Sequence, residues 1–186
     1  MSMIELVVPV LMDEPPPAGL QPAARRAFTK PIRVALIDNG KPKARELLEA
    51  ICKALNTHIP VASSRLIAKG SASRVIDDEE VEAISAQADV VITGLGDCGA
   101  CSACSLGDAV KMEAAGIPAT VVITDVFTRH IASFATTLGM PGYHAAVVPH
   151  PIYAKDAETL SQIAQELAAV VATQLQGEAV PPQRDR

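Results

Sequence analysis

The sequence predicts a three-layer α/β fold in which helices cover both faces of a doubly wound, mostly parallel five-stranded sheet. Short β-branched, apolar runs alternate with longer amphipathic segments along most of the chain, which is the order expected for βαβ units. Hydrophobic residues make up 49% of the chain but aromatic residues only 3%, so Ala and Val supply most of the core. Such small side chains suit helices that pack closely on a parallel sheet.

The strands and helices are expected to follow one another in alternation. The first strand stops at Asp38-Asn39-Gly40, and the third is the clearest central strand because it is almost wholly apolar. Right-handed crossovers would place helices on both faces, as in flavodoxin-like and Rossmann-like proteins. The predicted strands are 32–37, 59–67, 89–93, 119–124 and 145–148, and the predicted helices are 42–56, 77–87, 102–115, 125–138 and 156–176.

The chain is expected to form one domain with an extension at each end. Residues 1–31 form an N-terminal arm and Pro-rich lead-in, in which prolines prevent a helix while Arg25 and Arg26 keep the segment solvated. The first dozen residues are apolar enough for a strand, in this sheet or on a partner subunit. We expect residues 32–176 to form the single α/β domain and residues 177–186 a flexible tail.

Charge and cysteine content narrow the class of protein. The net charge of −5 argues against nucleic acid as a partner, because phosphate neutralisation needs a basic surface. No segment has the pattern of a signal peptide or a membrane-spanning helix, so we expect a cytoplasmic protein without a membrane partner. Three of the four cysteines, Cys98, Cys101 and Cys104, lie close together in the sequence. This bunching favours redox, catalytic or metal chemistry over a disulfide framework.

The segment Cys98-Gly99-Ala100-Cys101 is the expected chemical centre. Cys98 follows a strand and stands at or just before a helix start, where the helix dipole and free amides stabilise a thiolate. Cys101 lies three residues later and is placed to act as a resolving thiol. Asp97 is a candidate for helix capping or proton transfer. Gly96 and Gly99 allow a sharp turn that presents backbone N–H groups to a substrate.

Two other interpretations of this segment stay open. Cys98, Cys101 and Cys104 have a spacing that occurs in iron–sulfur proteins, but the continuation to a fourth cysteine followed by proline is absent. His150 could complete a zinc site, although nothing near it in the sequence demands one. In the second interpretation the cysteines have no chemical role and are small buried residues that pack between a strand and a helix. The glycines formally match a dinucleotide fingerprint, but they follow a middle strand without the required acidic residue, so no cofactor is expected.

Further candidate site residues stand at the carboxyl ends of other predicted strands, where ligands bind in such folds. His150, between two prolines, is the candidate general acid or base. Asp38 and Asn39 are candidates for binding a polar substrate group, as is Asp125. Arg129 offers a positive charge for a substrate carboxylate.

Three of these polar side chains also have a structural explanation. Asn39 followed by glycine favours a turn by itself, Asp125 is placed to cap the following helix, and Arg129 fits a solvated helix face. Lys41 would need a lowered pKa to form a Schiff base, and nothing in the sequence indicates one.

Several segments together resemble the UGSC family, named for a motif with selenocysteine or cysteine at its first position. In that motif Cys98 takes the selenocysteine position, Cys101 the final position, and Ala100 replaces the usual Ser. The family is similar to part of selenoprotein component B of glycine, sarcosine and betaine reductases, in which a selenol attacks a substrate carbon and displaces an amine. The resemblance rests on residues 36–42, 96–102, 108–109, 116–127 and 148–152, and so covers about residues 32–152.

The residues and the resemblance together predict a thiol-dependent oxidoreductase that cleaves a C–N or C–S bond of a small polar substrate. Cys98 would attack, Cys101 would resolve the adduct with an external thiol as final reductant, and His150 would handle protons. A hydrolase or lyase outcome needs no reductant. The alternatives are a metal- or cluster-binding subunit of a redox complex and a non-catalytic subunit of a homo- or hetero-oligomer.

Overall fold

The computed structural model describes residues 19–177. Within this part of the chain, strands and helices alternate as the sequence predicts. The expected strand in the first dozen residues and the expected flexible tail after Gly177 lie outside the described residues. The elements are β1 (Ile32–Asp38), α1 (Ala44–Leu55), β2 (Val61–Ala68), α2 (Asp78–Ser85), β3 (Val90–Gly96), α3 (Gly99–Ala114), β4 (Ala119–Thr124), the 3-10 turn η1 (Asp125–Phe127), α4 (Thr128–Thr137), β5 (Ala146–Val148) and α5 (Ala157–Gln176).

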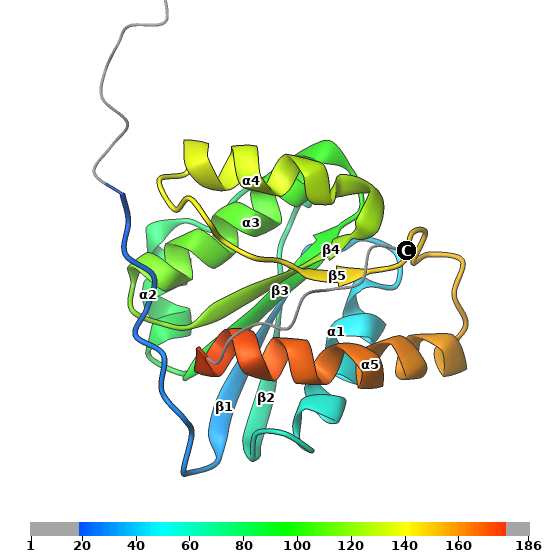
Figure 1. Cartoon of the computed structure of the whole chain (residues 1–186), viewed down its shortest axis with the longest axis horizontal. Helices are drawn as coiled ribbons and strands as arrows, with labels where there is room; N and C mark the ends of the chain where they lie inside the picture. The colour runs from blue at the N-terminus through cyan, green and yellow to red at the C-terminus, as the bar shows by residue number, and fades with distance from the viewer. Residues whose placement is uncertain (1–18, 178–186) are drawn as a thin grey trace, which may run out of the picture.

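The five strands form one sheet in the order β2-β1-β3-β4-β5, and every neighbouring pair is parallel. This is the flavodoxin-like strand order, so the predicted fold class is confirmed. Figure 1 shows α1 and α5 below the sheet and α3 and α4 above it, which gives the three layers. The order reverses between β1 and β3, and ligands bind at such a reversal in doubly wound sheets.

Two apolar clusters, one on each face of the sheet, hold the layers together. Side chains alternate along β1, so Val34 and Leu36 join the cluster under α1 and α5, while Ala35 and Ile37 join the cluster with α3. Strands β3 and β4 are buried along their whole length, which explains their nearly unbroken apolar sequences. At the edge, β2 is largely exposed.

The structure differs from the prediction at the junction of β3 and α3. The strand continues to Gly96, beyond the predicted end at residue 93, and the helix begins at Gly99 rather than at Ser102. The glycine-rich segment therefore extends the strand instead of forming a loop. Gly96 pairs with Ile123 of β4, and this position has no room for a side chain, because a Cβ on Gly96 would overlap the Ile123 side chain and lie 2.8 Å from Ser102 Oγ.

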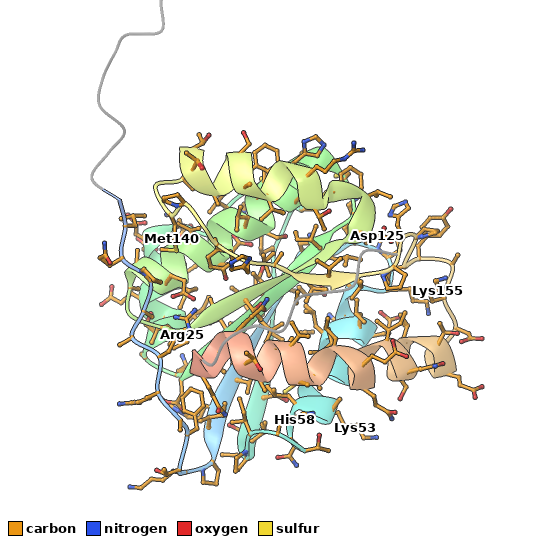
Figure 2. The ribbon with its side chains drawn as sticks, in the orientation of Figure 1. Arg25, Lys53, His58, Asp125, Met140 and Lys155 are labelled. Atoms are coloured by element: carbon orange, nitrogen blue, oxygen red, sulfur yellow. The ribbon has the colours of Figure 1, made fainter. Side chains whose placement is uncertain are left out.

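The described part of the lead-in, residues 19–31, has no helix, as expected, but our expectation that Arg25 is solvated is wrong. Its guanidinium binds both carboxylate oxygens of Glu113, at 2.5 and 2.7 Å, and its Nε donates to the carbonyl of Gln174 at 2.8 Å. The backbone N–H of Ala23 donates to the same carboxylate at 2.7 Å. Figure 2 shows Arg25 beside the end of α5. Glu113 is buried, and a buried carboxylate requires such partners.

Candidate thiol site at the carboxyl edge of the sheet

The loops that follow β1, β3, β4 and β5 meet at the carboxyl edge of the sheet. The backbone N–H of Asn39, after β1, donates to the carbonyl of Gly94 in β3 at 3.0 Å. The hydroxyl of Thr124, at the end of β4, donates to the carbonyl of Gly96 at 3.2 Å. Neighbouring strands therefore bind the segment that leads into the cysteines and fix its position.

Cys98 and Cys101 form a close pair at the start of α3. Cys98 is the N-cap of the helix, and its Sγ accepts a hydrogen bond from the Cys101 N–H at 3.2 Å. Cys98 is partly exposed, whereas Cys101 is only 3% exposed. Burial, together with the neighbouring Cys98 thiol, raises the pKa of Cys101 to about 11. The two cysteines therefore differ: one is reachable from solvent, and the other is covered and held protonated.

Lys41 places a positive charge beside this pair. Its Nζ lies 3.1 Å from Asp97 Oδ1. The close contact with the Asp97 carboxylate raises the pKa of Lys41, and negative charge at Cys101 and Cys98 raises it further. This direction is opposite to the one that a Schiff-base lysine requires. The sequence analysis did not predict this role of Lys41, although its position in the loop that follows β1 was a usable signal.

His150 lies at the same edge, but its hydrogen-bond partner there is Thr124 and not a cysteine. Its Nδ1 lies 3.2 Å from Thr124 Oγ1, and its ring packs edge-on against Phe127 at 6.0 Å. Thr124 donates its only hydroxyl proton to Gly96, so we assign the proton of the neutral imidazole to Nδ1. Nε2 is then free to accept a proton. In the part of the chain that the structure describes, no hydrogen bond joins His150 to either cysteine.

Asp38 and Asn39 have structural partners. Asp38, the last residue of β1, accepts a hydrogen bond from the Gly40 N–H at 2.9 Å, and both Asp38 and Asn39 are buried. The Asn39 amide donates to the Leu95 carbonyl at 2.8 Å and to Ser105 Oγ at 3.2 Å. These contacts tie the loop after β1 to β3 and α3. A role in substrate binding stays a prediction for both residues.

The other expected binding residues are divided between the interior and the surface. Gly96 is buried under α3, while Gly99 is exposed and has open space where a Cβ would stand. Asp125 and Arg129 are exposed, and Figure 2 shows Asp125 at the outer edge near the end of β4. Gly99 is therefore the exposed glycine beside the cysteine pair, and Asp125 and Arg129 are exposed on the segment that follows β4. Their roles toward a substrate stay predictions.

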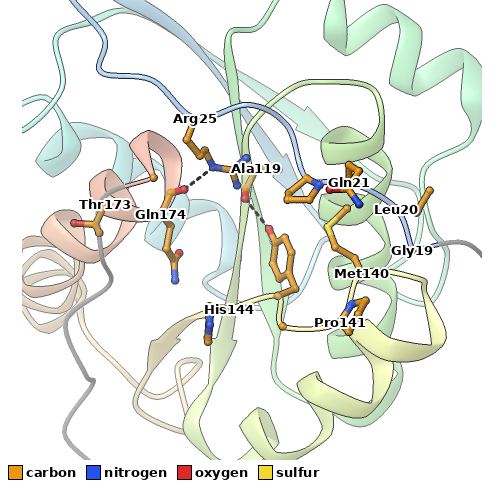
Figure 3. A pocket seen from close by; sticks show the side chains of 14 residues that line it. Gly19, Leu20, Gln21, Arg25, Ala119, Met140, Pro141, His144, Thr173 and Gln174 are labelled. Atoms are coloured by element: carbon orange, nitrogen blue, oxygen red, sulfur yellow. Dashed lines mark hydrogen bonds between the residues drawn. The ribbon is translucent and has the colours of Figure 1, made fainter.

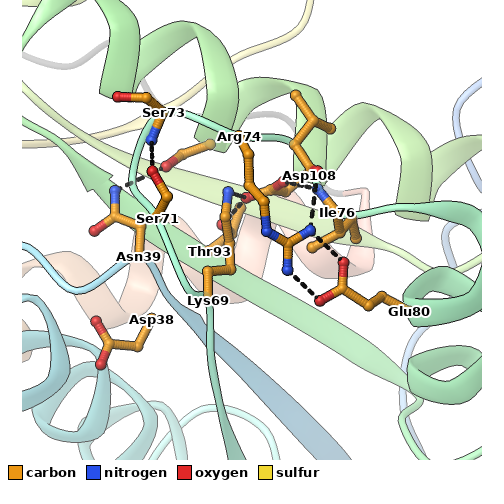
Figure 4. A network of polar contacts seen from close by, with 12 residues as sticks. Asp38, Asn39, Lys69, Ser71, Ser73, Arg74, Ile76, Glu80, Thr93 and Asp108 are labelled. Atoms are coloured by element: carbon orange, nitrogen blue, oxygen red, sulfur yellow. Dashed lines mark hydrogen bonds and ion pairs between the residues drawn. The ribbon is translucent and has the colours of Figure 1, made fainter.

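A buried ion pair joins Lys69, the residue that follows β2, to Asp108 in α3 (Figure 4). Lys69 Nζ lies 2.6 Å from Asp108 Oδ2, and both side chains are fully buried. Asp108 also accepts hydrogen bonds from the Ile76 N–H at 2.8 Å and the Thr93 hydroxyl at 3.3 Å. Burial raises the pKa of Asp108, and these partners oppose the shift. The network fastens the segment between β2 and α2 onto α3.

The metal-ligating side chains that the structure gathers differ from the expected trio of cysteines. One donor atom each from Asp97, Cys98 and Cys101 lies within 4.8 Å of the other two. Cys104 is not part of this group, and burial raises the pKa of its thiol. The third candidate ligand beside Cys98 and Cys101 is therefore Asp97, and not Cys104 as the sequence predicted.

A pocket of about 380 Å³ lies at the opposite, amino edge of the sheet (Figure 3). It is formed between the lead-in around Leu20, the segment after α4 and the end of α5. Tyr143 lines it and donates its hydroxyl proton to the carbonyl of Ala119, the first residue of β4, at 2.6 Å. This pocket is thus separate from the thiol site, which is at the other end of the strands.

Fold and site together define a flavodoxin-like α/β protein with a cysteine pair at the carboxyl edge of its sheet. The model of the UGSC family matches residues 5–177, and the chain therefore belongs to this family, as the resemblance implied. A search of curated proteins finds no match. In the described residues, no helix is both long enough and apolar enough to cross a membrane.

Some solved structures are also similar to the chain. A diflavin flavoprotein A3 from Nostoc sp. is 12% identical, with a TM-score of 0.40 over 78% of this chain and 96% of that one. A flavodoxin-like domain from Synechococcus sp. is 15% identical, with a TM-score of 0.39 over 78% of this chain and 96% of that one. These scores are low, and the assignment of the fold rests on the strand order.

Proposed function

We propose that this protein is a thiol-dependent enzyme in which Cys98 attacks an electrophilic carbon or sulfur atom of a small polar substrate. The single observation that carries the proposal is the Cys101 N–H, which donates to Cys98 Sγ at 3.2 Å at the start of α3. A thiolate at a helix start is favoured by such N–H groups and by the helix dipole. The ammonium of Lys41, which pairs with the adjacent Asp97, adds a positive charge.

The reaction proceeds in two steps. In the first, the Cys98 thiolate forms a bond to the substrate and the leaving group departs with the electron pair of the broken bond. In the second, Cys101 attacks the sulfur of the Cys98 adduct, the substrate fragment leaves with the bonding electrons and takes up a proton, and a Cys98–Cys101 disulfide forms. The substrate gains two electrons, and an external thiol must reduce the disulfide.

The proposed roles follow from the differences between the side chains. Cys98 attacks because it is reachable from solvent, whereas Cys101 is covered and acts once the first step has brought the adduct next to it. His150 supplies or removes the proton through Nε2, because Thr124 occupies Nδ1. Arg129 and Gly99, which are exposed, are proposed to bind the polar part of the substrate. If water cleaves the adduct instead, the reaction is hydrolytic and needs no reductant.

Alkylation of the reduced protein with limiting iodoacetamide near neutral pH tests the reactive thiol. Peptide mass spectrometry should find Cys98 modified first, because Cys101 is buried and its raised pKa keeps it protonated. Cys98→Ala should abolish the fast phase. Cys104→Ala removes a neighbouring half-buried thiol and should leave that phase unchanged. Equal labelling of all four cysteines would contradict an activated Cys98.

Adduct trapping tests catalysis directly. Cys101→Ser removes the proposed resolving thiol, so a substrate from cell extract should stay attached to Cys98 and appear as added intact mass. The wild-type protein should instead lose two hydrogen atoms as the disulfide forms. The double variant Cys98→Ala/Cys101→Ser is the matched control. An adduct that also forms on this double variant would contradict the proposed attack by Cys98.

A further inference from the structure

We propose that Asp97, Cys98 and Cys101 bind one Zn²⁺ ion, with water in the fourth position, and that the bound ion masks the thiol pair. The inference does not rest on the proposed enzyme activity, because zinc affinity is measured without a substrate. It begins from the group of three donor atoms that lie within 4.8 Å of one another. In the described residues this is the one such group of His, Cys, Asp or Glu side chains.

A tetrahedral ion needs the donor atoms somewhat closer together than the 4.8 Å within which they all lie. Zn²⁺ with ligands at about 2.0–2.3 Å holds neighbouring donor atoms roughly 3.3–3.8 Å apart, so small side-chain rotations close the group around it. Two thiolates and one carboxylate form a ligand set that the borderline-soft Zn²⁺ accepts, whereas Mg²⁺ and Ca²⁺ prefer all-oxygen sites. Three protein ligands leave one coordination position open.

The surroundings admit an ion and balance its charge. Asp97 and Cys98 are partly exposed, and the space above Gly99 is open, so an ion reaches the group from solvent. Binding releases the thiol protons to water as the two Zn–S bonds form. The ligands then carry three negative charges, and Zn²⁺ with the ammonium of Lys41 beside Asp97 supplies three positive ones. The site is thus formally neutral.

Bound zinc masks the thiol pair because its two sulfur ligands are the atoms that would form the disulfide. The same two sulfur atoms cannot bind Zn²⁺ and also form a disulfide, because both reactions use the thiolate electron pairs. Zinc binding and oxidation of the pair therefore exclude each other. A pair of reactive thiols that binds zinc is protected from oxidants until the ion is removed.

The test measures binding of Zn²⁺ alone to the reduced full-length protein, in competition with a chromophoric chelator. Wild-type protein should bind one ion per chain. Cys98→Ser and Cys101→Ser should abolish binding, and Asp97→Asn, which keeps the side-chain shape, should weaken it at least about tenfold, since even outer-shell changes cost 10–100-fold. Cys104→Ser and His150→Gln are the matched controls and should bind as wild type does.

A second measurement needs no substitution and so does not depend on whether the Cys101 variant folds. Diamide should oxidise the pair to a disulfide and abolish zinc binding, and dithiothreitol should restore it. Zinc added before diamide should slow the oxidation. Failure of the folded, reduced wild type to bind zinc would overturn the inference, as would binding that survives Cys98→Ser or requires Cys104. The alkylation test of Cys98 uses no zinc, so its result does not depend on whether the zinc inference holds.

Discussion

Lys41 Nζ lies 3.1 Å from Asp97 Oδ1, and this ion pair joins the loop after β1 to the residue that precedes Cys98. Strands β1 and β3 are neighbours at the point where the strand order reverses. The pair therefore lies at the strand-order reversal, which is where doubly wound folds bind their ligands. The positive charge beside the thiols comes from a residue far from them in the sequence.

Removing this charge should slow the reaction of Cys98. Lys41→Met should reduce the rate of Cys98 alkylation near neutral pH by roughly three- to tenfold, because about 1.4 kcal/mol of lost thiolate stabilisation is a factor of ten. The effect should be no larger than this, because Lys41 is 29% exposed and solvent screens its charge. Lys41→Arg keeps the charge and is the control. Equal rates for wild type and Lys41→Met would contradict a role for this ammonium.

The buried pair of Lys69 and Asp108 should be important for stability. Lys69→Met leaves a carboxylate buried without its ion partner, and we expect the free energy of unfolding in urea to fall by about 3–5 kcal/mol. Adding Asp108→Asn should cost much less than the sum of the two single changes, since the charge left without a partner is then gone. Strictly additive losses would show that the two groups act independently.

Gly96 should tolerate no side chain, in contrast to Gly99. Gly96→Ala places a Cβ against Ile123 and Ser102, and we expect unfolding in urea to require about 1–3 kcal/mol less free energy. Gly99→Ala meets open space in the first turn of α3 and should be neutral or slightly stabilising. A loss of stability for Gly99→Ala as large as that for Gly96→Ala would contradict this account of the junction.

Acid should weaken the start of α2 through Glu80. Its carboxylate binds the Arg74 guanidinium at 2.5 and 2.6 Å and accepts from the Asp77 N–H, which lowers its pKa from 4.5 to about 2. Between these values the unfolded chain binds the extra proton, so the contribution is complete above about pH 4.5 and disappears as the pH falls to about 2.

Thermal melts over this pH range test the point. Glu80→Gln should lower the melting temperature near neutral pH, and it should make the melting temperature depend less on pH between about 4.5 and 2 than in wild type. Glu79→Gln removes the adjacent exposed carboxylate and is the control. Parallel wild-type and Glu80→Gln curves would show that the ion pair with Arg74 adds nothing.

Patterns local in the sequence predicted most of the fold. Apolar runs predicted all five strands, and β4 has the bounds that were expected. Asp77 and Asp156 cap α2 and α5, because their side chains accept hydrogen bonds from the N–H groups of residues three positions later. This capping signal is contained in a short stretch of chain. The errors lie at the start of α3 and at Arg25, where distant residues decide: Ile123 and Ser102 at Gly96, and Glu113 at Arg25.

The sequence by itself determined the fold class and the position of the cysteine pair, because hydrophobic period, turn residues and the Cys98–Cys101 spacing are local properties of the chain. The family was identified by the resemblance of its motifs, which are also local. Only the tertiary structure decided which charges surround that pair. It brought Lys41 to Asp97, paired His150 with Thr124, and separated Cys104 from the donor group. The parallel sheet is the physical reason, since it brings loops from distant strands to one edge, and their contacts there depend on packing between strands.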